Sequence, residues 1–112
     1  EPLVPDLAGW KRERLPFLPE SAYFEVIPDW VCEVLSPSSA AVDRVEKMPI
    51  YASRGVTHTW LIDPLLETLE VFRLEGERWF LAGTYRGAAT VRAEPFAAIE
   101  LELAPLWIPR AK

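Results

Sequence analysis

The segment PDWVCEVLSPS, residues 28–38, is the most informative about the fold because it combines a buried strand with the signals that begin a helix. Residues 30–35 are apolar on both faces except at Glu33, which is typical of a strand that is covered on both sides. Side chains alternate along a strand, so Glu33 is expected to share one face with Val31 and Leu35. A carboxylate in such a strand is unfavourable unless a metal ion or a partner side chain compensates its charge. Glu33 is therefore the first candidate functional residue.

A helix is expected directly after that strand, over residues 40–54. Serines within residues 36–39 supply candidate N-caps, and Gly55 is a favoured residue just beyond a helix C-terminus. Pro49 lies inside the span, and because it lacks a backbone N–H it is expected to kink the helix or split it near Met48. The order strand, helix, strand predicts a crossover connection.

The other alternating or apolar stretches predict further strands. They are expected at residues 3–10, with Pro5 at the beginning, and at residues 57–63, 68–74, 78–85, 89–93 and 99–103. A turn at residues 75–77 joins two of them as a hairpin. The sequence therefore predicts a single α/β domain over residues 1–112, with a mixed β-sheet, a crossover helix after the Glu33 strand and C-terminal β-hairpins.

Composition narrows the class of protein. Half of the 112 residues are hydrophobic (50%), which favours a globular chain over a disordered one. The net charge of −5, from 12 basic and 17 acidic residues, argues against a general basic nucleic-acid binder. Cys32 is the only cysteine, which excludes an internal disulfide and a thiolate zinc cluster. No apolar run approaches the roughly 20 residues of a membrane span and no signal peptide is visible, so a cytoplasmic protein without a membrane partner is expected.

Asp6 is a second acid in an expected strand, 27 positions before Glu33. If the two strands are neighbours, both carboxylates can converge on one ion. Two carboxylates with water and a phosphate suit Mg²⁺ or Mn²⁺ better than zinc. Lys47 lies 14 residues after Glu33, on the helix that packs back on the sheet. Asp43, Lys47 and Tyr51 are spaced by four residues and therefore share one helix face.

Each of these residues also has a purely structural explanation. Asp6 could bond nearby amides at a strand end, and Glu33 could belong to a buried salt bridge. Lys47 and Asp43 could form an ordinary i,i+4 ion pair on a solvated face. His58, at the start of an expected strand, is interpreted as structural. The residue pattern leaves both explanations open for the acids and the lysine.

Five blocks of the chain form a more specific pattern than any single residue. They are VPD at 4–6, PDWVCEVLSPS at 28–38, DRVEK at 43–47, YASRGV at 51–56 and WLIDP at 60–64. Together these blocks closely resemble the Uma-type family of restriction endonucleases, which belongs to the PD-(D/E)XK nuclease superfamily. The resemblance covers nearly the whole chain and implies a restriction-endonuclease-like fold.

The resemblance also implies roles for matching residues. Asp6 corresponds to the first aspartate of the superfamily motif, and Glu33 corresponds to the acid of its second half. The motif lysine normally follows two residues after that acid, where this chain has Leu35. The resemblance therefore assigns the lysine to Lys47 on the following helix. Family members usually carry a helix and strands before the Pro-Asp strand, so the chain is expected to lack N-terminal elements.

The implied activity is metal-assisted hydrolysis of DNA phosphodiester bonds. Asp6 and Glu33 are expected to hold Mg²⁺ or Mn²⁺, with the backbone carbonyl of Val34 as a further ligand. Lys47 is expected to orient or deprotonate the attacking water, or to offset charge on the phosphate. The candidate supporting residues around this site are Ser36, Asp43 and Tyr51.

A second hypothesis comes from a different class of function. A catalytically inactive nuclease-fold domain could serve as a dimerisation or nucleic-acid-docking module. Loss of N-terminal elements would expose a sheet edge and favour pairing with another chain, so a homodimer is expected. A third hypothesis, which the resemblance permits, is a toxin-like or mobile-element product.

Overall fold

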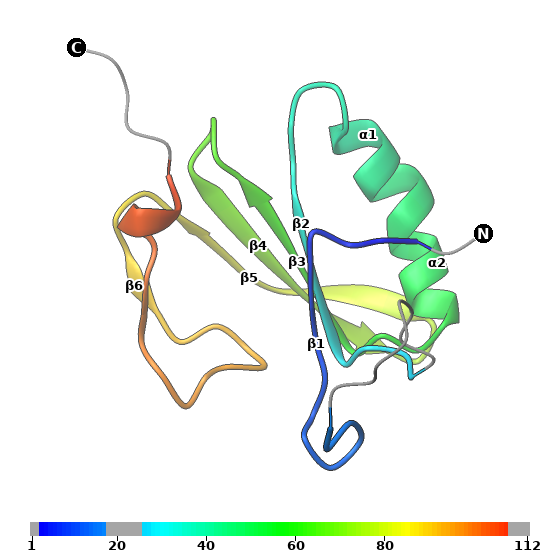
Figure 1. Ribbon diagram of the computed structural model, residues 1–112. Coiled ribbons are helices and arrows are strands. Elements are labelled where there is room, and N and C mark those ends of the chain that lie inside the picture. The colour runs from blue at the N-terminus through cyan, green and yellow to red at the C-terminus, as the bar shows by residue number, and fades with distance from the viewer. Residues whose placement is uncertain (1–2, 18–25, 108–112) are drawn as a thin grey trace.

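The computed structural model describes residues 3–17 and 26–107, which form a five-stranded mixed sheet, a crossover helix and a small two-stranded sheet (Figure 1). The strands of the large sheet are β1 (Leu7–Gly9), β2 (Trp30–Val34), β3 (His58–Asp63), β4 (Thr68–Glu75) and β5 (Arg78–Arg86). They lie in the order β1-β2-β3-β4-β5. The small sheet and the 3-10 helix after it are β6 (Thr90–Val91), β7 (Leu101–Glu102) and η2 (Ala104–Leu106). The predicted mixed sheet with a crossover helix is confirmed.

Strands β2 and β3 form the centre of the sheet. They are parallel and are connected by the helix, as the strand-helix-strand pattern predicts. Strand β1 pairs antiparallel with β2, and β4 pairs antiparallel with β3. Because both central strands are covered on their two faces, they are apolar at nearly every position. This arrangement places Glu33 in the interior of the protein.

The crossover helix changes its geometry in the middle. It consists of α1 (Ala40–Val42), a π-helical turn η1 (Asp43–Lys47) and α2 (Met48–Ser53). The N–H of Met48 bonds to the carbonyl of Asp43, five residues back, and Pro49, which has no N–H, follows directly. The residue without a donor thus lies where the helix returns to α geometry. The predicted kink or split near Met48 is replaced by a wider turn in a continuous helix (Figure 1).

Gly55 ends the helix, as the sequence predicts, with a positive φ of 82°. Its N–H bonds to the carbonyl of Ala52, and the N–H of Val56 bonds to the carbonyl of Tyr51, both at 3.1 Å. This pair of bonds is a Schellman motif. Val56 and Tyr51 also pack together in the core. The motif fixes the end of the helix at which Tyr51 lies.

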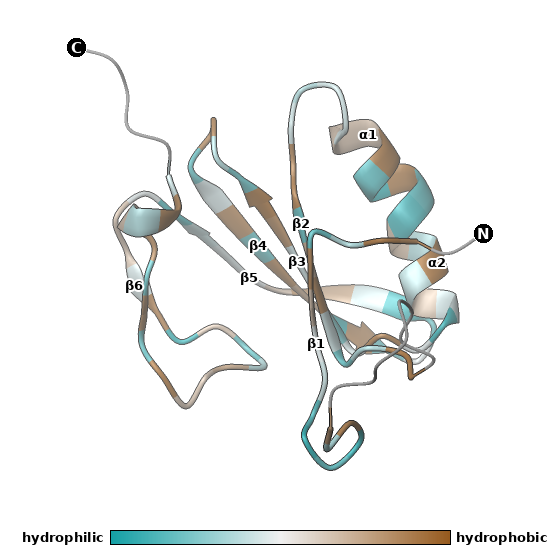
Figure 2. Ribbon diagram, viewed as in Figure 1, coloured by the Kyte–Doolittle hydropathy of each residue, from teal (hydrophilic) through white to brown (hydrophobic). Residues whose placement is uncertain are grey.

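Apolar side chains form a core on each face of the sheet, and Figure 2 shows their distribution along the ribbon. Beneath the helix the buried residues are Val31, Leu35, Met48, Tyr51, Val56 and Leu61. On the opposite face they are Cys32, Trp60, Ile62, Leu69, Val71, Val91, Ala93 and Leu103. Val31 and Leu35 thus lie on the helix side and Cys32 on the other, which confirms the predicted alternation around Glu33. None of the described helical segments is long and apolar enough to cross a membrane.

Three strands are much shorter than predicted. The first begins at Leu7 instead of residue 3, because the Asp6 side chain, and not a backbone carbonyl of that strand, accepts the N–H of Val34 on β2. The strands expected at 89–93 and 99–103 contract to β6 and β7, because the chain between them forms turns instead of an extended ladder. The predicted β4–β5 hairpin is present, and Gly76 in its turn has a positive φ of 65°.

Candidate active site

Glu33 is the buried acid of the candidate site, and only 1% of its surface is exposed. The hydroxyl of Tyr51 donates a hydrogen bond to Glu33 Oε2 at 2.5 Å, and Lys47 Nζ lies 3.4 Å from the same oxygen. Burial raises the pKa of Glu33 above its usual range, and the Tyr51 hydrogen bond and the Lys47 charge only partly offset this rise. One carboxylate oxygen is therefore contacted by two donors from the helix.

Lys47 connects two buried acids. Its Nζ lies 3.0 Å from Asp43 Oδ1 as well as 3.4 Å from Glu33 Oε2, and Asp43 is only 3% exposed. Burial lowers the pKa of Lys47, but Asp43 and Glu33 together outweigh burial and hold the pKa above its ordinary value. The i,i+4 pair exists, yet it faces the sheet and not a solvated surface. Lys47 is therefore a cation held between carboxylates.

Asp6 lies directly before β1 and contacts β2 next to Glu33. The ladder between β1 and β2 ends at the pair of Leu7 with Cys32, and Asp6 directly precedes Leu7. The Asp6 carboxylate accepts the N–H of Val34 at 2.6 Å. Burial is the main cause of the raised pKa of both Glu33 and Cys32, and the Asp6 charge adds to each rise. The bond to the Val34 N–H places the Asp6 carboxylate at the edge of β2.

The donor atoms at this edge fit a hard divalent cation. Asp6 and Glu33 each keep one carboxylate oxygen that makes no hydrogen bond to another described residue. The N–H and C=O of one strand residue leave the strand on the same side, so the Val34 carbonyl is expected on the side of β2 where Asp6 accepts the Val34 N–H. Residues 3–17 and 26–107 contain no cluster of three or more His, Cys, Asp or Glu side chains suited to a metal. Two carboxylates and a carbonyl leave room for the water and phosphate ligands that Mg²⁺ retains.

The helix supplies three of the predicted residues from one face. Lys47 and Tyr51 meet at one oxygen of Glu33, and Asp43 supports Lys47 from one turn earlier. The π-helical turn spans Asp43 to Lys47, and such turns are frequent at functional sites because they reorient side chains within a helix. The expectation that the three residues share a face is confirmed.

Ser36 is the predicted supporting residue that lies apart from this group. Its hydroxyl bonds to the hydroxyls of Ser38 and Ser39 at 3.1 and 3.0 Å. Its carbonyl accepts the N–H groups of Ser39 and Ala40 at 3.1 and 3.0 Å. Ser36 therefore organises the loop that begins the helix.

Two arginines near the site are not singled out by the sequence pattern. Arg44 Nη2 bonds to Glu70 Oε1 on β4 at 2.6 Å and ties the helix to the sheet. Arg54 follows Tyr51 by three residues and lines a cavity that also contains Asp6. The i,i+3 spacing from Tyr51 is the signal that would identify Arg54 as a neighbour of the site.

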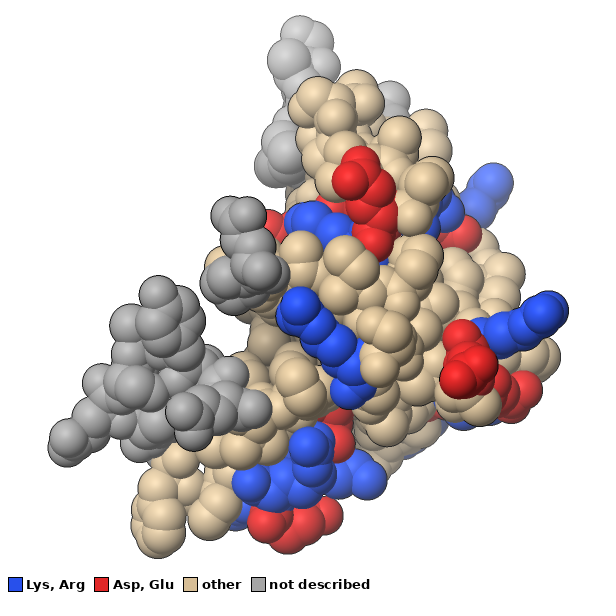
Figure 3. Space-filling view, turned by 90° about the vertical axis from the view of Figure 1, so that its right-hand side faces the viewer, with Lys and Arg blue, Asp and Glu red and all other residues tan. Residues whose placement is uncertain are grey.

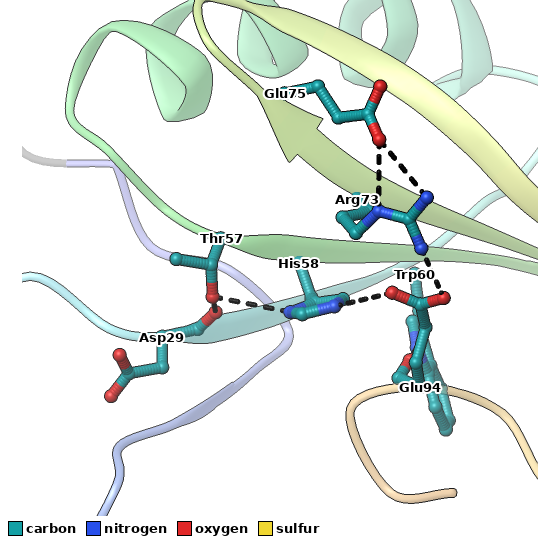
Figure 4. Close-up of polar contacts among 7 residues, drawn as sticks. All are labelled: Asp29, Thr57, His58, Trp60, Arg73, Glu75 and Glu94. Atoms are coloured by element: carbon teal, nitrogen blue, oxygen red, sulfur yellow. Dashed lines mark hydrogen bonds and ion pairs between the residues drawn. The ribbon is translucent and has the colours of Figure 1, made fainter.

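A separate polar cluster joins the C-terminal segment to the sheet (Figure 4). Glu94 lies between His58 and Arg73, with a distance of 2.9 Å to His58 Nε2 and 2.8 Å to Arg73 Nη1. Glu75 contacts the same guanidinium, and Trp60 Nε1 donates to the Glu94 carbonyl at 2.8 Å. These contacts give His58 a structural role, consistent with its interpretation from the sequence.

The mixed sheet, the crossover helix and the buried acid–lysine group define a restriction-endonuclease-like α/β protein. The chain belongs to the Uma2 family, described as "Putative restriction endonuclease", whose family model matches residues 2–105. The chain is also similar to the crystal structure of "a putative nuclease belonging to DUF820 from Anabaena variabilis ATCC 29413", with a TM-score of 0.69 and 25% identity. The match covers 94% of this chain and 59% of that one, so the chain spans about three fifths of that protein's length. No curated protein matches the chain.

Proposed function

We propose that this chain carries a Mg²⁺- or Mn²⁺-dependent nuclease centre that hydrolyses DNA phosphodiester bonds. The observation that carries the proposal is that Asp6 contacts β2 at the residue after Glu33, while Lys47 contacts the Glu33 carboxylate. Asp6 binds the N–H of the residue next to Glu33, and Lys47 lies 3.4 Å from the Glu33 carboxylate. The family and the nuclease-like neighbour support this class of reaction.

Asp6 and Glu33 are the proposed ligands of the ion, with the Val34 carbonyl as a third. Tyr51 fixes the Glu33 carboxylate by its hydrogen bond at 2.5 Å, so the acid is oriented before any ion binds. Asp6 is exposed, which leaves this side of the site open to a substrate. When bound, the ion supplies Lewis-acid activation of the phosphate and a lowered pKa for the attacking water.

Lys47 acts in this proposal through its charge. Because its pKa is raised by Asp43 and Glu33, Lys47 stays protonated at neutral pH and does not remove a proton from water. An ammonium group held beside the acid site can orient water or offset developing charge on the phosphate. Asp43 positions Lys47 through the contact of 3.0 Å.

Plasmid nicking with Mg²⁺ or Mn²⁺ tests the activity. A supercoiled plasmid contains both duplex DNA and locally unpaired strands, so it is a substrate whichever of the two the centre requires. We expect nicking by the unmodified chain and a loss of at least about 100-fold in Glu33→Gln and in Asp6→Asn, because each removes a metal-binding charge. Mn²⁺ titration calorimetry on the same variants separates loss of ion binding from loss of chemistry.

Glu102→Gln is the matched control. It removes one carboxylate from an exposed position of β7, which belongs to the small sheet, and is expected to leave nicking unchanged. Equal nicking by Glu33→Gln and Glu102→Gln would remove the proposed centre.

A second function, dimerisation or docking without catalysis, is favoured by strand β5. This strand is nine residues long, lies at the edge of the sheet and exposes Phe80 and Leu81 at 46% and 47%. A long edge strand with exposed apolar side chains is a template for pairing with another chain. Light scattering that gives a dimer mass, with no nicking under any metal condition, would favour this function over catalysis.

A further inference from the structure

A cavity of about 650 Å³ lies between β1 and the end of helix α2. Its wall includes Asp6 and Tyr51 of the candidate site, and also Arg54. The rest of the wall is mostly apolar and includes Ala8 and Val31. Ligand pockets commonly have this size and combine an apolar wall with a small number of polar groups. The cavity therefore has the properties of a binding site that adjoins the acid group.

Arg54 gives this cavity its positive charge. Among the described residues it is the single basic side chain on the wall, and it is exposed. The Arg54 guanidinium forms no hydrogen bond or ion pair with another described residue. The Tyr51 hydroxyl, in contrast, is already bonded to Glu33. A guanidinium with free donors recognises phosphate through paired hydrogen bonds.

We propose that this cavity receives one unpaired nucleotide of the cleaved strand, beside the phosphate that is held at Asp6 and Glu33. The base lies against the apolar wall, and Arg54 binds the phosphate of that nucleotide. A base inside a duplex must leave its stack to enter such a cavity. The inference rests on the proposed nuclease function and adds a substrate class to it, namely single-stranded or locally unpaired nucleic acid.

The distribution of charge favours local recognition of this kind. Figure 3 shows the helix side of the molecule, where Lys and Arg side chains lie in separate groups with acidic and uncharged surface between the groups. The chain as a whole carries a charge of −5. Binding through a base cavity and few phosphate contacts needs less positive surface than binding along a duplex backbone.

A second cavity, of about 730 Å³, lies on the other flank of the helix. It is lined by the β4–β5 hairpin, including Arg78 and Trp79, and by none of the three proposed catalytic residues. Arg78 therefore provides a control. It has the same charge as Arg54 and also lines a cavity, but no nucleotide is expected to bind there.

The test is fluorescence anisotropy in EDTA with a labelled single-stranded oligonucleotide of about 12 nucleotides, a length within known single-strand site sizes, and with its duplex. We expect tighter binding of the single strand. Arg54→Gln should weaken this binding by about tenfold and reduce the dependence of log Kd on log salt by about one unit, because one phosphate contact is lost. Ala8→Leu, which fills the cavity, should also weaken binding, and Arg78→Gln should leave it unchanged.

Equal or tighter binding of the duplex would overturn the inference, as would binding of neither probe or equal effects of Arg54→Gln and Arg78→Gln. If Ala8→Leu does not fold, the exposed Arg54 position still decides the result. Nicking that is normal in Arg54→Gln would overturn the nucleotide cavity and retain the nuclease centre. Binding that depends on Arg54 without any nicking would retain the cavity and overturn the nuclease centre.

Discussion

The hydroxyl of Tyr51 donates to Glu33 Oε2 at 2.5 Å, and both side chains are buried. Tyr51 lies in the last turn of the helix, whereas Glu33 lies in the strand before it. Lys47 approaches the same oxygen, so both helix contacts fall on Oε2, and no other described residue bonds to the second oxygen. The helix therefore both covers the strand and orients its buried acid.

Glu33→Gln is expected to stabilise the metal-free protein at neutral pH. Burial raises the pKa of Glu33, so its contribution to stability is present below the unfolded pKa near 4.5 and is lost as the pH rises through the folded pKa. Glutamine stays neutral and still accepts the Tyr51 hydrogen bond. Thermal unfolding in EDTA between pH 4 and pH 8 should show a variant that melts a few degrees higher at pH 7, with a difference that shrinks toward pH 4. Glu102→Gln should show no such trend, and a Glu33→Gln variant that melts lower at pH 7 would contradict the expectation.

Lys47→Met is expected to impair both stability and activity. It leaves two buried carboxylates without their cation, which should cost about 3 kcal/mol of unfolding free energy, and it should reduce nicking by about 100-fold or more. Lys47→Arg keeps the charge and should retain part of the activity. Since the pKa of Lys47 is raised from 10.5, no loss of activity from its deprotonation should appear in a pH–rate profile below that value. Lys11→Met, at an exposed loop position, is the control, and equal nicking by the two methionine variants would contradict the role of Lys47.

Pro49→Ala tests whether the π-helical turn places the site. Alanine restores a backbone N–H and allows the turn to tighten into an α-helix, which should raise stability by about 1–3 kcal/mol. The same change would rotate Lys47 relative to Tyr51, so Mn²⁺ affinity and nicking should fall. Thermal unfolding and Mn²⁺ titration measure the two effects, with Ser53→Ala on the same helix as the control. A more stable variant with unchanged Mn²⁺ affinity would show that the wide turn is not required.

Glu94→Gln should affect stability and leave nicking intact, because Glu94 belongs to the cluster around His58 and Arg73. Burial alone would raise the pKa of Glu94, but the hydrogen bonds from His58 and Arg73 outweigh it and lower the pKa. The stabilisation is therefore present above the unfolded pKa near 4.5 and is lost as the pH falls through the folded pKa. We expect a loss of about 1 kcal/mol at pH 7 and a weaker dependence of stability on acid pH.

Glu100→Gln is the control for that variant, because Glu100 pairs with Arg92 at the surface and its side chain is 63% exposed. Its effect should be close to zero. Chemical denaturation at pH 7 and pH 4 distinguishes the two variants. Identical changes in both would show that the Glu94 cluster does not hold the C-terminal segment.

Local patterns were sufficient to predict the strand around Glu33, the helix after it and the role of Gly55. They succeed because strand alternation and helix termination depend on neighbouring residues and on backbone sterics. The same patterns overestimated β1, since the Asp6 side chain ends the ladder through a bond to Val34 on another strand. They also predicted a break at Pro49 where the helix widens instead.

Two features of the site could be read from the sequence, namely that Glu33 faces inward and that Lys47 and Tyr51 share a helix face, because both follow from fixed residue periods. The folded structure alone shows that these groups meet at one oxygen of Glu33, that Asp6 binds the residue after Glu33 and that Arg54 shares a cavity with Asp6. Contacts of this second kind depend on strand register and on how the helix lies across the sheet. Both are set by packing among residues far apart in the chain, which no local period encodes.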